Sequence, residues 1–432
     1  MTRHEAIVIG AGISGLVSAS ILLNQGLRDI AVVDEYAHVG GNHVDVAIGD
    51  YTFDVGSFIF QDDSPLLRHF PELLLRYLPF VPTWARVNPQ GVVTKYPFSL
   101  RDDILATGPV EIVKIVASAL AARLDRRPQR NARDFVRHWV GARFLRRSGL
   151  EHYMARFCGC AIDEIDLAFA QTRMVWLPEK ASVAGIARRF GARLARAVRG
   201  IPENRQLARP REGFEPLYRP VVQRLEERGA RFVLAAPLAS VTKAAGEFQV
   251  QTDTHQYRAP RLISTIPVGR IRELSGHSPV DCLPSVTLVS LFYSFSGDRG
   301  FGEMILYNFT YTAAWKRLTV YSDLYGLVDG REYFTAEVVS GAEGLSVEEA
   351  AAEFRAHTAE NGLLVGDLHL EGSHVLSQAY PIYTAGSAGR AARAVQELRE
   401  MGIESFGRQG AFQYQPTARV STLEAEAALR GM

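Results

Sequence analysis

A glycine motif near the N-terminus constrains the fold of this chain more than any other feature. Three glycines, in the segment Gly10-Ala-Gly-Ile-Ser-Gly, separate a short apolar run over residues 5–9 from an apolar stretch that continues to residue 23. That stretch has helical spacing, and a further apolar run over residues 29–33 ends at Asp34. A strand, a glycine-rich turn, a helix and a second strand ending in an acid form the opening βαβ unit of a dinucleotide-binding domain.

Each residue type in this unit has a mechanical reason. Gly10 permits the tight turn, Gly12 allows a pyrophosphate to approach the backbone, and Gly15 allows the helix to pack closely on the strand. The helix N-terminus attracts the anion, and Asp34 is placed to bind ribose hydroxyls. We therefore predict a dinucleotide cofactor at this turn.

The composition excludes several other classes of protein. The 432 residues include 48 Lys+Arg and 47 Asp+Glu, a balance that argues against a general nucleic-acid binder. Three cysteines (Cys158, Cys160 and Cys282) cannot form a disulfide framework, and neither they nor the histidines show the spacing of a metal site. No apolar stretch approaches the length of about 20 residues that an integral membrane helix requires. We predict no metal and a cytoplasmic location.

The near-zero net charge conceals a basic middle section. Residues 123–211 carry 20 Lys+Arg against 8 Asp+Glu, so the rest of the chain is acidic. Such a positive field, focused on a cleft, would attract a small phosphorylated ligand. Within this section, residues 181–198 repeat apolar side chains at every fourth position between arginines. We favour a cap helix that packs its apolar stripe inward, and peripheral contact with anionic lipid is the alternative.

Three further segments resemble FAD enzymes of the amine-oxidase and glutathione-reductase-like families. The second strand is followed by Gly40-Gly41-Asn42, which resembles their extended FAD motif, and residues 261–267 resemble their central strand. Residues 405–414 resemble the segment that returns to the flavin near the C-terminus. The resemblance implies FAD as the cofactor and a Rossmann-like α/β FAD-binding domain of the glutathione-reductase type. The residues implied to contact FAD are Gly10, Gly12, Ile13, Ser14, Gly15, Asp34, Glu35, Gly40, Gly41, Asn42, Gly56, Ser57, Phe58, Gly407 and Arg408.

The FAD-binding domain is expected to be discontinuous, over residues 1–65, 206–275 and 376–432. Residues 66–205 form a predicted helical cap, with helices over 109–124, 132–140, 149–157 and 181–198. Residues 276–375 contain alternating aromatic-rich runs, such as 286–295 and 304–309, and these predict a mixed or antiparallel substrate sheet. A helix over 347–361 follows. Cap, sheet and FAD-binding domain would meet around one cleft.

Ordered matches along nearly the whole chain resemble the flavin-dependent UDP-galactopyranose mutases. Residues 55–61 resemble the mutase segment after the glycine pair, and residues 91–98 resemble its hairpin and Pro-Phe element. The spacing in residues 168–173 and 307–317 resembles that of two segments that carry diphosphate-binding arginines. The residues that the resemblance implies for substrate binding are Tyr153, Cys158, Arg173, Asn308, Arg317, Tyr380 and Tyr414.

A mutase of this kind interconverts the pyranose and furanose ring forms of a nucleotide sugar through an adduct between N5 of reduced FAD and the sugar. The resemblance implies no catalytic side chain. Arg173, Arg317, Tyr380 and Tyr414 would support the reaction, since guanidinium stays charged and offers paired donors to phosphate oxygens. The implied partner is a small-molecule nucleotide sugar. NAD(P)H as an external reductant and a homodimer remain open alternatives.

Two departures from the mutase pattern leave the substrate open. The mutases have a His-x-x-His arrangement where this chain has Phe58-Ile-Phe-Gln61. Cys158 replaces the tryptophan that helps to sandwich uracil, so a stacking surface is lost. We therefore expect a non-standard base or sugar, or another reaction. The main alternative is an FAD-dependent oxidase or dehydrogenase of the amine-oxidase superfamily that acts on a small molecule, because such an enzyme shares every FAD motif.

Overall fold

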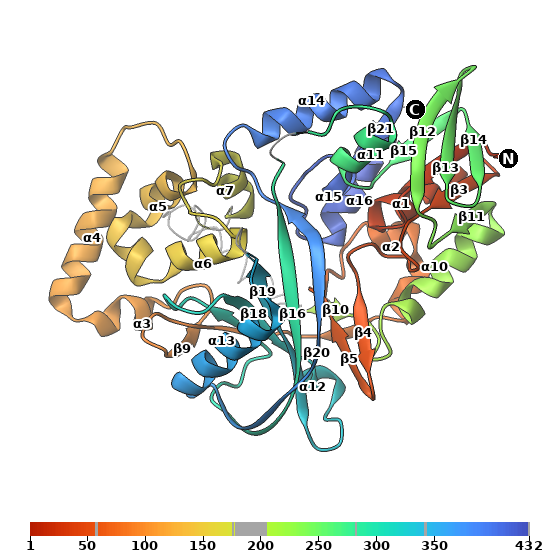
Figure 1. Ribbon diagram of the computed structural model, residues 1–432. Helices are drawn as coiled ribbons and strands as arrows, with labels where there is room; N and C mark the ends of the chain where they lie inside the picture. Colours follow the sequence, from red (N-terminus) through yellow and green to blue (C-terminus); the bar gives the residue numbers. More distant parts are fainter. Residues whose placement is uncertain (57–58, 175–176, 178–204, 281–282, 341–343, 431–432) are drawn as a thin grey trace, which may run out of the picture.

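The computed structural model describes residues 1–56, 59–174, 177, 205–280, 283–340 and 344–430. Figure 1 shows a helix-covered sheet at one end of the molecule, a long sheet in the centre and a helical lobe at the other end. The predicted helix over 181–198 and the predicted flavin contacts Ser57 and Phe58 lie outside the described residues.

The sheet that carries the glycine motif has five parallel strands. Their order is β11 (Ala230–Val233), β3 (Ile30–Val33), β2 (Ala6–Ile9), β15 (Arg261–Ser264) and β21 (Ile403–Ser405). Alternate residues of β2 and β3 pack toward α1 (Ile13–Asn24) and α16 (Ala418–Leu429) on one face, and toward α11 (Val268–Leu274) and α14 (Ser387–Glu400) on the other. Burial on both faces explains the uninterrupted apolar runs of the sequence. The prediction of a Rossmann-like α/β fold is confirmed.

The parallel sheet collects strands from three distant parts of the chain. β2 and β3 come from the N-terminal part, β11 and β15 from the middle and β21 from the C-terminal part. The helix α10 (Glu215–Glu227) leads into β11. A second sheet beside it has the order β1 (Thr2–Arg3), β14 (Gln256–Ala259), β13 (Glu247–Thr252) and β12 (Leu238–Ala244). The domain limits themselves stay a prediction.

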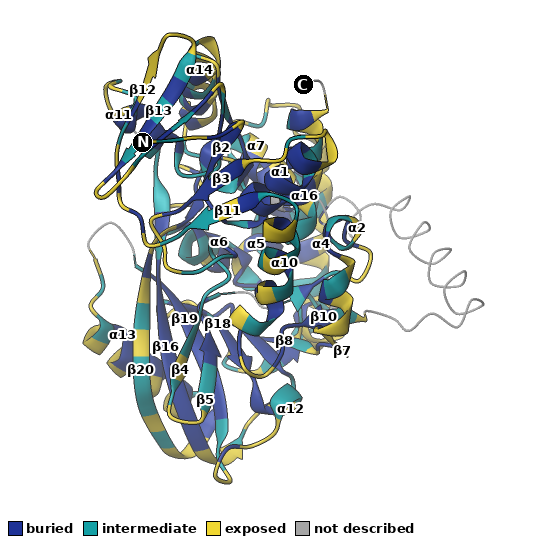
Figure 2. Cartoon of the chain, turned by 90° about the vertical axis from the view of Figure 1, so that its right-hand side faces the viewer, coloured by how far each residue is buried: buried dark blue, intermediate teal, exposed yellow. Residues whose placement is uncertain are grey.

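The long central sheet has seven strands. Its order is β20 (Leu364–Pro381), β16 (Ser285–Arg299), β19 (Glu332–Ser340), β18 (Trp315–Val320), β17 (Ile305–Asn308), β8 (Trp84–Val87) and β9 (Val93–Lys95). All neighbours are antiparallel except β17 and β8, so the sheet is mixed, as predicted. Apolar residues of β16 and β19 pack on α13 (Val347–Glu360). Figure 2 shows that β16 is mostly buried, whereas the edge strand β20 is largely intermediate or exposed.

The helical lobe has helices at or close to three of the predicted ranges, 109–124, 132–140 and 149–157, while the cap as a domain stays a prediction. It contains α3 (Leu100–Asp103), the 3-10 turn η2 (Leu105–Thr107), α4 (Pro109–Leu124), α5 (Ala132–Arg147), α6 (Leu150–Cys158) and α7 (Leu167–Arg173). The prediction that residues 66–205 form a helical cap is wrong for residues 78–95. There β7 (Leu78–Phe80), β8 and β9 form strands, because β8 pairs with β17, more than 200 residues further along the chain.

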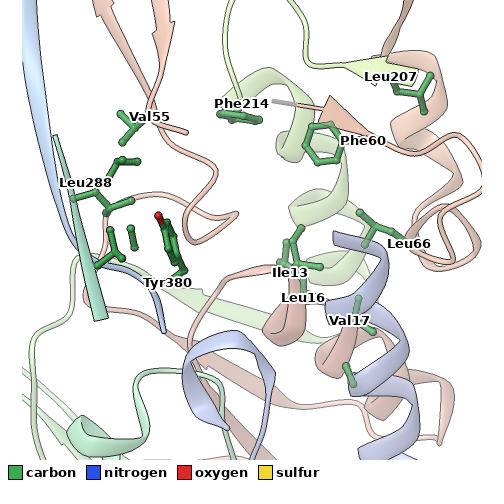
Figure 3. Close-up of a cluster of buried hydrophobic side chains, with 14 of the residues drawn as sticks. Ile13, Leu16, Val17, Val55, Phe60, Leu66, Leu207, Phe214, Leu288 and Tyr380 are labelled. Atoms are coloured by element: carbon green, nitrogen blue, oxygen red, sulfur yellow. The ribbon is translucent and has the colours of Figure 1, made fainter. Parts of the chain in front are cut away.

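Short elements join these parts. They are the hairpin β4 (Asp45–Ile48) and β5 (Tyr51–Asp54), the sheet of β6 (Ile59–Phe60), β10 (Gln206–Ala208) and β7, and the helical turns α2 (Leu66–His69), η1 (Pro71–Leu75), α12 (Ser322–Tyr325) and α15 (Gly407–Gly410). Figure 3 shows the largest apolar cluster, in which α1 side chains such as Ile13 lie on one side and Tyr380 lies with Leu288 on the other. No single helix of the described part is long and apolar enough to span a membrane.

Candidate active site

A crevice lies at the carboxyl ends of β2, β3 and β15, where the two predicted glycine turns meet. Gly12 and Gly40 form a parallel bridge, and a Cβ added at Gly41 would lie 3.1 Å from the Gly12 Cα. The crevice opens at the N-terminus of α1, which no described side chain caps. Ligands of open parallel sheets bind at this edge, and uncapped helix N–H groups attract anions.

Two glycines outside the lining hold the crevice in shape. A Cβ added at Gly15 would lie 1.8 Å from the carbonyl oxygen of Gly10, so only glycine allows α1 to pack this closely on the preceding turn. Gly407 has a φ of +92°, and a Cβ there would lie 2.8 Å from Ser14 Oγ. Both glycines therefore act through backbone packing.

Asp34 lies in the crevice and is fixed to its wall. Its carboxylate accepts hydrogen bonds from the backbone N–H of Ala11 at 2.6 Å and of Tyr36 at 2.9 Å. Burial raises the pKa of Asp34, and these hydrogen bonds oppose that shift. Glu35, which the sequence places beside it as a flavin contact, points elsewhere: its carboxylate accepts from Leu238 N and pairs with Arg270 at 2.9 Å.

The crevice gathers nine of the predicted flavin contacts and several residues that sequence analysis missed. The predicted residues that line it are Gly10, Gly12, Ile13, Ser14, Asp34, Gly40, Gly41, Asn42 and Arg408. The missed residues include Thr265, Pro267 and His43. Burial, together with the charge of Arg408, lowers the pKa of His43 to about 3, and its Nδ1 lies 2.5 Å from the Tyr218 hydroxyl. A neutral histidine thus lies at the inner end of the crevice.

A second cavity of about 250 Å³ adjoins the crevice. Asn42, His43, Arg408 and Ala418 line both spaces, so a ligand in the crevice would reach the cavity. Gly56 lies in the cavity wall, away from the crevice. The aromatic residues that line the cavity are Tyr153, Phe157, Tyr307, Tyr380 and Tyr414. The phenol of Tyr380 stacks on Phe157 at 5.0 Å, and its hydroxyl donates to the Phe157 carbonyl oxygen at 2.7 Å.

Two adjacent cations, Lys316 and Arg317, face this cavity from β18. Neighbouring residues of a regular strand point to opposite faces, but the pairing of β18 with β19 shifts between Trp315 and Arg317. The resulting irregularity leaves Lys316 as an extra residue and lets both cations reach Glu337. Trp315 points to the other face, where its Nε1 donates to His357 at 3.1 Å.

The charges of this cluster are strongly coupled. Lys316 Nζ lies 3.0 Å from Glu337 Oε2, and Arg317 pairs with the other oxygen of the same carboxylate. Burial alone would raise the pKa of Glu337, but the two cations outweigh it and hold that pKa below its usual range. Burial would likewise lower the pKa of Arg317, and the Glu337 carboxylate raises it instead. With Arg408, the described cavity lining carries three cations against one carboxylate.

Lys316 also lies between two aromatic rings. Its Nζ is 5.1 Å from the centroid of Phe157 and 4.9 Å from that of Tyr380, and it donates to the Tyr380 hydroxyl at 3.3 Å. The lysine is almost fully buried, and cation–π contacts gain strength in such surroundings. The hydroxyl of Tyr380 is therefore already engaged by protein groups. Tyr414, the other tyrosine predicted to contact the substrate, packs its ring edge to face with the ring of Tyr380.

Of the other residues predicted to bind substrate, some line the cavity and others lie outside it. Tyr153 lines the cavity and stacks on Phe309 at 4.3 Å. Cys158 is buried outside it, beside a small apolar space of about 20 Å³, and Phe157 takes the place at the cavity wall. Asn308 is also fully buried, and its side chain holds the following turn by accepting from Thr310 N at 2.9 Å. Arg173 ends α7, and its side chain lies outside the described part.

A half-buried carboxyl group in α16 supports the segment that returns to the crevice. Glu424 accepts a hydrogen bond from Gln415, and burial raises the pKa of Glu424 to about 7. Because this pKa lies above the ordinary 4.5, the folded protein holds the Glu424 proton more tightly than the unfolded chain does. Protonated Glu424 therefore stabilises the fold fully below pH 4.5, and this stabilisation is lost as the pH rises to about 7.

We therefore predict that Glu424→Gln gains stability relative to the wild type as the pH rises. The difference in the free energy of unfolding between variant and wild type should increase by about 2 kcal/mol from pH 4.5 to pH 8. Urea unfolding of both proteins at several pH values measures this difference. A difference that stays constant with pH would contradict the assignment.

Comparisons with known proteins agree with this architecture. A family profile described as an NAD(P)-binding Rossmann-like domain matches residues 8–72, the segment that holds both glycine turns. The fold is also similar over its whole length to several solved structures. The crystal structure of reduced UDP-galactopyranose mutase matches with a TM-score of 0.79 and 16% identity, covering 98% of this chain and 94% of that chain.

Two other solved structures show the same fold with different names. A protein from Exiguobacterium sp. 255-15, provisionally named a protoporphyrinogen oxidase, matches with a TM-score of 0.74 and 16% identity over 100% of this chain and 98% of that chain. Cyclohexylamine oxidase from Brevibacterium oxydans IH-35A matches with a TM-score of 0.65 and 14% identity over 99% of each chain. At these identities the similarity concerns the fold and does not decide the reaction.

Proposed function

We propose that this protein is a flavoenzyme that holds FAD in the glycine crevice. The uncapped N-terminus of α1 and the close approach of Gly12 to Gly41 suit a pyrophosphate, and the fixed carboxylate of Asp34 suits ribose hydroxyls. The adjoining cavity would then receive the reactive end of the cofactor together with the substrate, since Arg408 and His43 line both spaces.

The substrate that best matches the charge of the cavity is a nucleotide sugar, and the reaction would be interconversion of its pyranose and furanose forms. The observation that carries this proposal is the charge of the lining: Lys316, Arg317 and Arg408 face one carboxylate, Glu337. A diphosphate brings the negative charge that complements this excess of cations. An amine substrate, which is a cation at neutral pH, would be repelled.

The side chains of this protein would contribute by positioning the substrate. Bound in its reduced form, FAD would supply the nucleophile for this reaction. Arg317 and Lys316 would hold the diphosphate near the sugar for its return, and Tyr414 would contact the sugar nucleotide from the cofactor side of the cavity. Among the described lining residues, Glu337 is engaged by two cations and His43 stays neutral, so neither is placed as a general acid.

A second candidate is an FAD-dependent oxidase or dehydrogenase that acts on a small anion. The cavity volume of about 250 Å³ favours this alternative, because it lies just below the range of about 300–1,000 Å³ that is usual for ligand pockets. The position of Cys158 favours the same alternative. Cys158 is buried behind Phe157, so it provides no surface on which the base of a nucleotide could stack. NAD(P)H would serve only the mutase candidate as an external reductant, because an oxidase or dehydrogenase takes its electrons from the substrate and passes them to an acceptor.

A titration that follows the flavin absorbance tests the charge argument. We expect inorganic diphosphate and UDP to perturb the flavin spectrum of the holoprotein at micromolar to millimolar concentrations, and putrescine to leave it unchanged. A spectral change with the diamine and none with either diphosphate would overturn both candidates. Purification of the protein without FAD, and failure of the apoprotein to bind it, would overturn the assignment of the cofactor.

A further inference from the structure

The outermost helix of the helical lobe carries an unusually apolar exposed surface. In α4 the side chains of Val113, Leu120 and Leu124 are 66%, 61% and 80% exposed, and Val110 and Val116 share their face. The opposite face packs on α5 through Ile115 and Ala122. A soluble helix normally turns its apolar face inward, so this second apolar stripe requires an explanation.

The position of α4 lets a large flat partner reach this stripe. Figure 1 shows α4 at the edge of the lobe, at the end of the molecule away from the parallel sheet. The preceding turn η2 meets α4 at a sharp bend, and its Leu105 is also exposed. The bend between residues 101–107 and α4 is 118°, so these segments form a corner and not a continuous rod.

Basic side chains border the stripe. On a helix of about 3.6 residues per turn, Lys114 and Arg123 lie at its two edges. The acidic residue of the helix, Glu111, lies toward α5 and is neutralised there by Arg143 at 2.5 Å. Exposed arginines at positions 126, 127 and 130 follow the end of the helix. The stripe is therefore apolar in the middle and positive at its margins.

A polar cleft of about 320 Å³ continues the positive margin beyond the end of α4. The ionisable residues of its lining are Arg127, Arg130, Arg137, His138, Asp125 and Asp134. The two carboxylates already accept hydrogen bonds from the backbone N–H groups of Arg127 and Arg130, both at 3.1 Å. Three guanidinium groups outnumber the two carboxylates, and Arg127 lies 3.8 Å from Asp125, so the cleft keeps a small excess of positive charge for an anionic group.

We propose that α4 is a peripheral membrane-binding element that lies in the surface of an anionic lipid bilayer. The apolar stripe would enter the boundary between headgroups and acyl chains, while the basic margins and the arginine cleft would meet lipid phosphates. Charge favours lipid over a second copy of this chain, because pairing of two such helices would bring their basic margins together. This inference does not depend on the reaction or on the cofactor.

Sedimentation of the full-length protein with vesicles tests the proposal. We expect the partition coefficient for vesicles of phosphatidylglycerol and phosphatidylcholine to exceed that for phosphatidylcholine alone by about tenfold or more, and to fall with added salt. Val113→Glu combined with Leu120→Glu should reduce it by about tenfold or more. The matched control is Leu327→Glu combined with Val365→Glu, two residues of 56% and 57% exposure outside the lobe, and it should change nothing.

A second measurement keeps the test decisive if the double variant folds poorly. Leu120→Trp should show stronger fluorescence quenching by brominated anionic lipid than the wild type, because the new side chain would lie among acyl chains. Equal quenching, or binding to vesicles that the double variant does not weaken, would overturn the proposal. So would a dimer in light scattering that the double variant converts to a monomer, with no binding to vesicles by either protein.

Discussion

Gly12→Ala is expected to fold normally and to bind FAD about 50-fold more weakly than the wild type. The φ of Gly12 is −72°, which alanine adopts without strain, and the nearest atom to an added Cβ is the Gly41 Cα at 3.5 Å, an ordinary contact. The methyl group would, however, stand between the two glycine turns where the pyrophosphate must approach. Fluorescence titration of the apoprotein with FAD measures the loss.

Two matched variants separate a cofactor effect from a folding effect. Gly269→Ala lies in α11, where an added Cβ meets nothing within 4 Å, and it should bind FAD like the wild type. Gly15→Ala places its Cβ 1.8 Å from the Gly10 carbonyl oxygen, so it should lower the melting temperature as well as FAD content. Unchanged FAD affinity in Gly12→Ala would show that no phosphate lies at this turn.

Arg317→Met should weaken the binding of inorganic diphosphate and UDP to the holoprotein by about 100-fold, since it removes a half-buried, preorganised cation. Lys316→Met should cost about tenfold, because a lysine offers a point charge without the paired donors of a guanidinium. Isothermal titration of each variant measures both effects. Arg317 would be the larger contributor because it lies directly opposite Glu337 and is fixed by it.

The control for this pair is Arg331→Met, immediately before the neighbouring strand β19. Arg331 pairs at 2.8 Å with Asp367, a largely exposed residue, and it does not line the cavity, so its loss should leave diphosphate binding unchanged. Thermal unfolding checks that removal of Arg317 leaves the sheet intact. Equal diphosphate affinity in wild type and Arg317→Met would remove the main support for a phosphorylated substrate.

Much of the cofactor-binding fold could be predicted because its signals are local. The glycine turn requires particular backbone space within a few residues, and β2 and β3 read as apolar runs because helices cover both faces of the sheet. The structure places α4 at residues 109–124, the predicted bounds, since Gly108 and Pro109 mark its start. Such features depend little on distant parts of the chain.

The cavity beside the crevice was harder to predict because its geometry depends on long-range pairing. The irregularity that turns both Lys316 and Arg317 toward Glu337 becomes visible only when β18 is aligned with β19. The pairing of β8 with β17 was missed within the predicted cap because the two strands are distant in sequence, and β9 joins the sheet through β8. His43 carried no motif, and its place at the junction follows from the packing of the second glycine turn against Tyr218.

Turnover of nucleotide sugars by reduced and oxidised holoprotein tests the central claim most directly. The protein should be reduced with dithionite without oxygen, supplied with a panel of nucleotide sugars, and the products separated by chromatography into pyranose and furanose forms. We expect interconversion of at least one sugar by the reduced protein only, with the flavin spectrum unchanged after turnover. Bleaching of the oxidised flavin by a substrate, with peroxide formed in air and no ring interconversion, would contradict it.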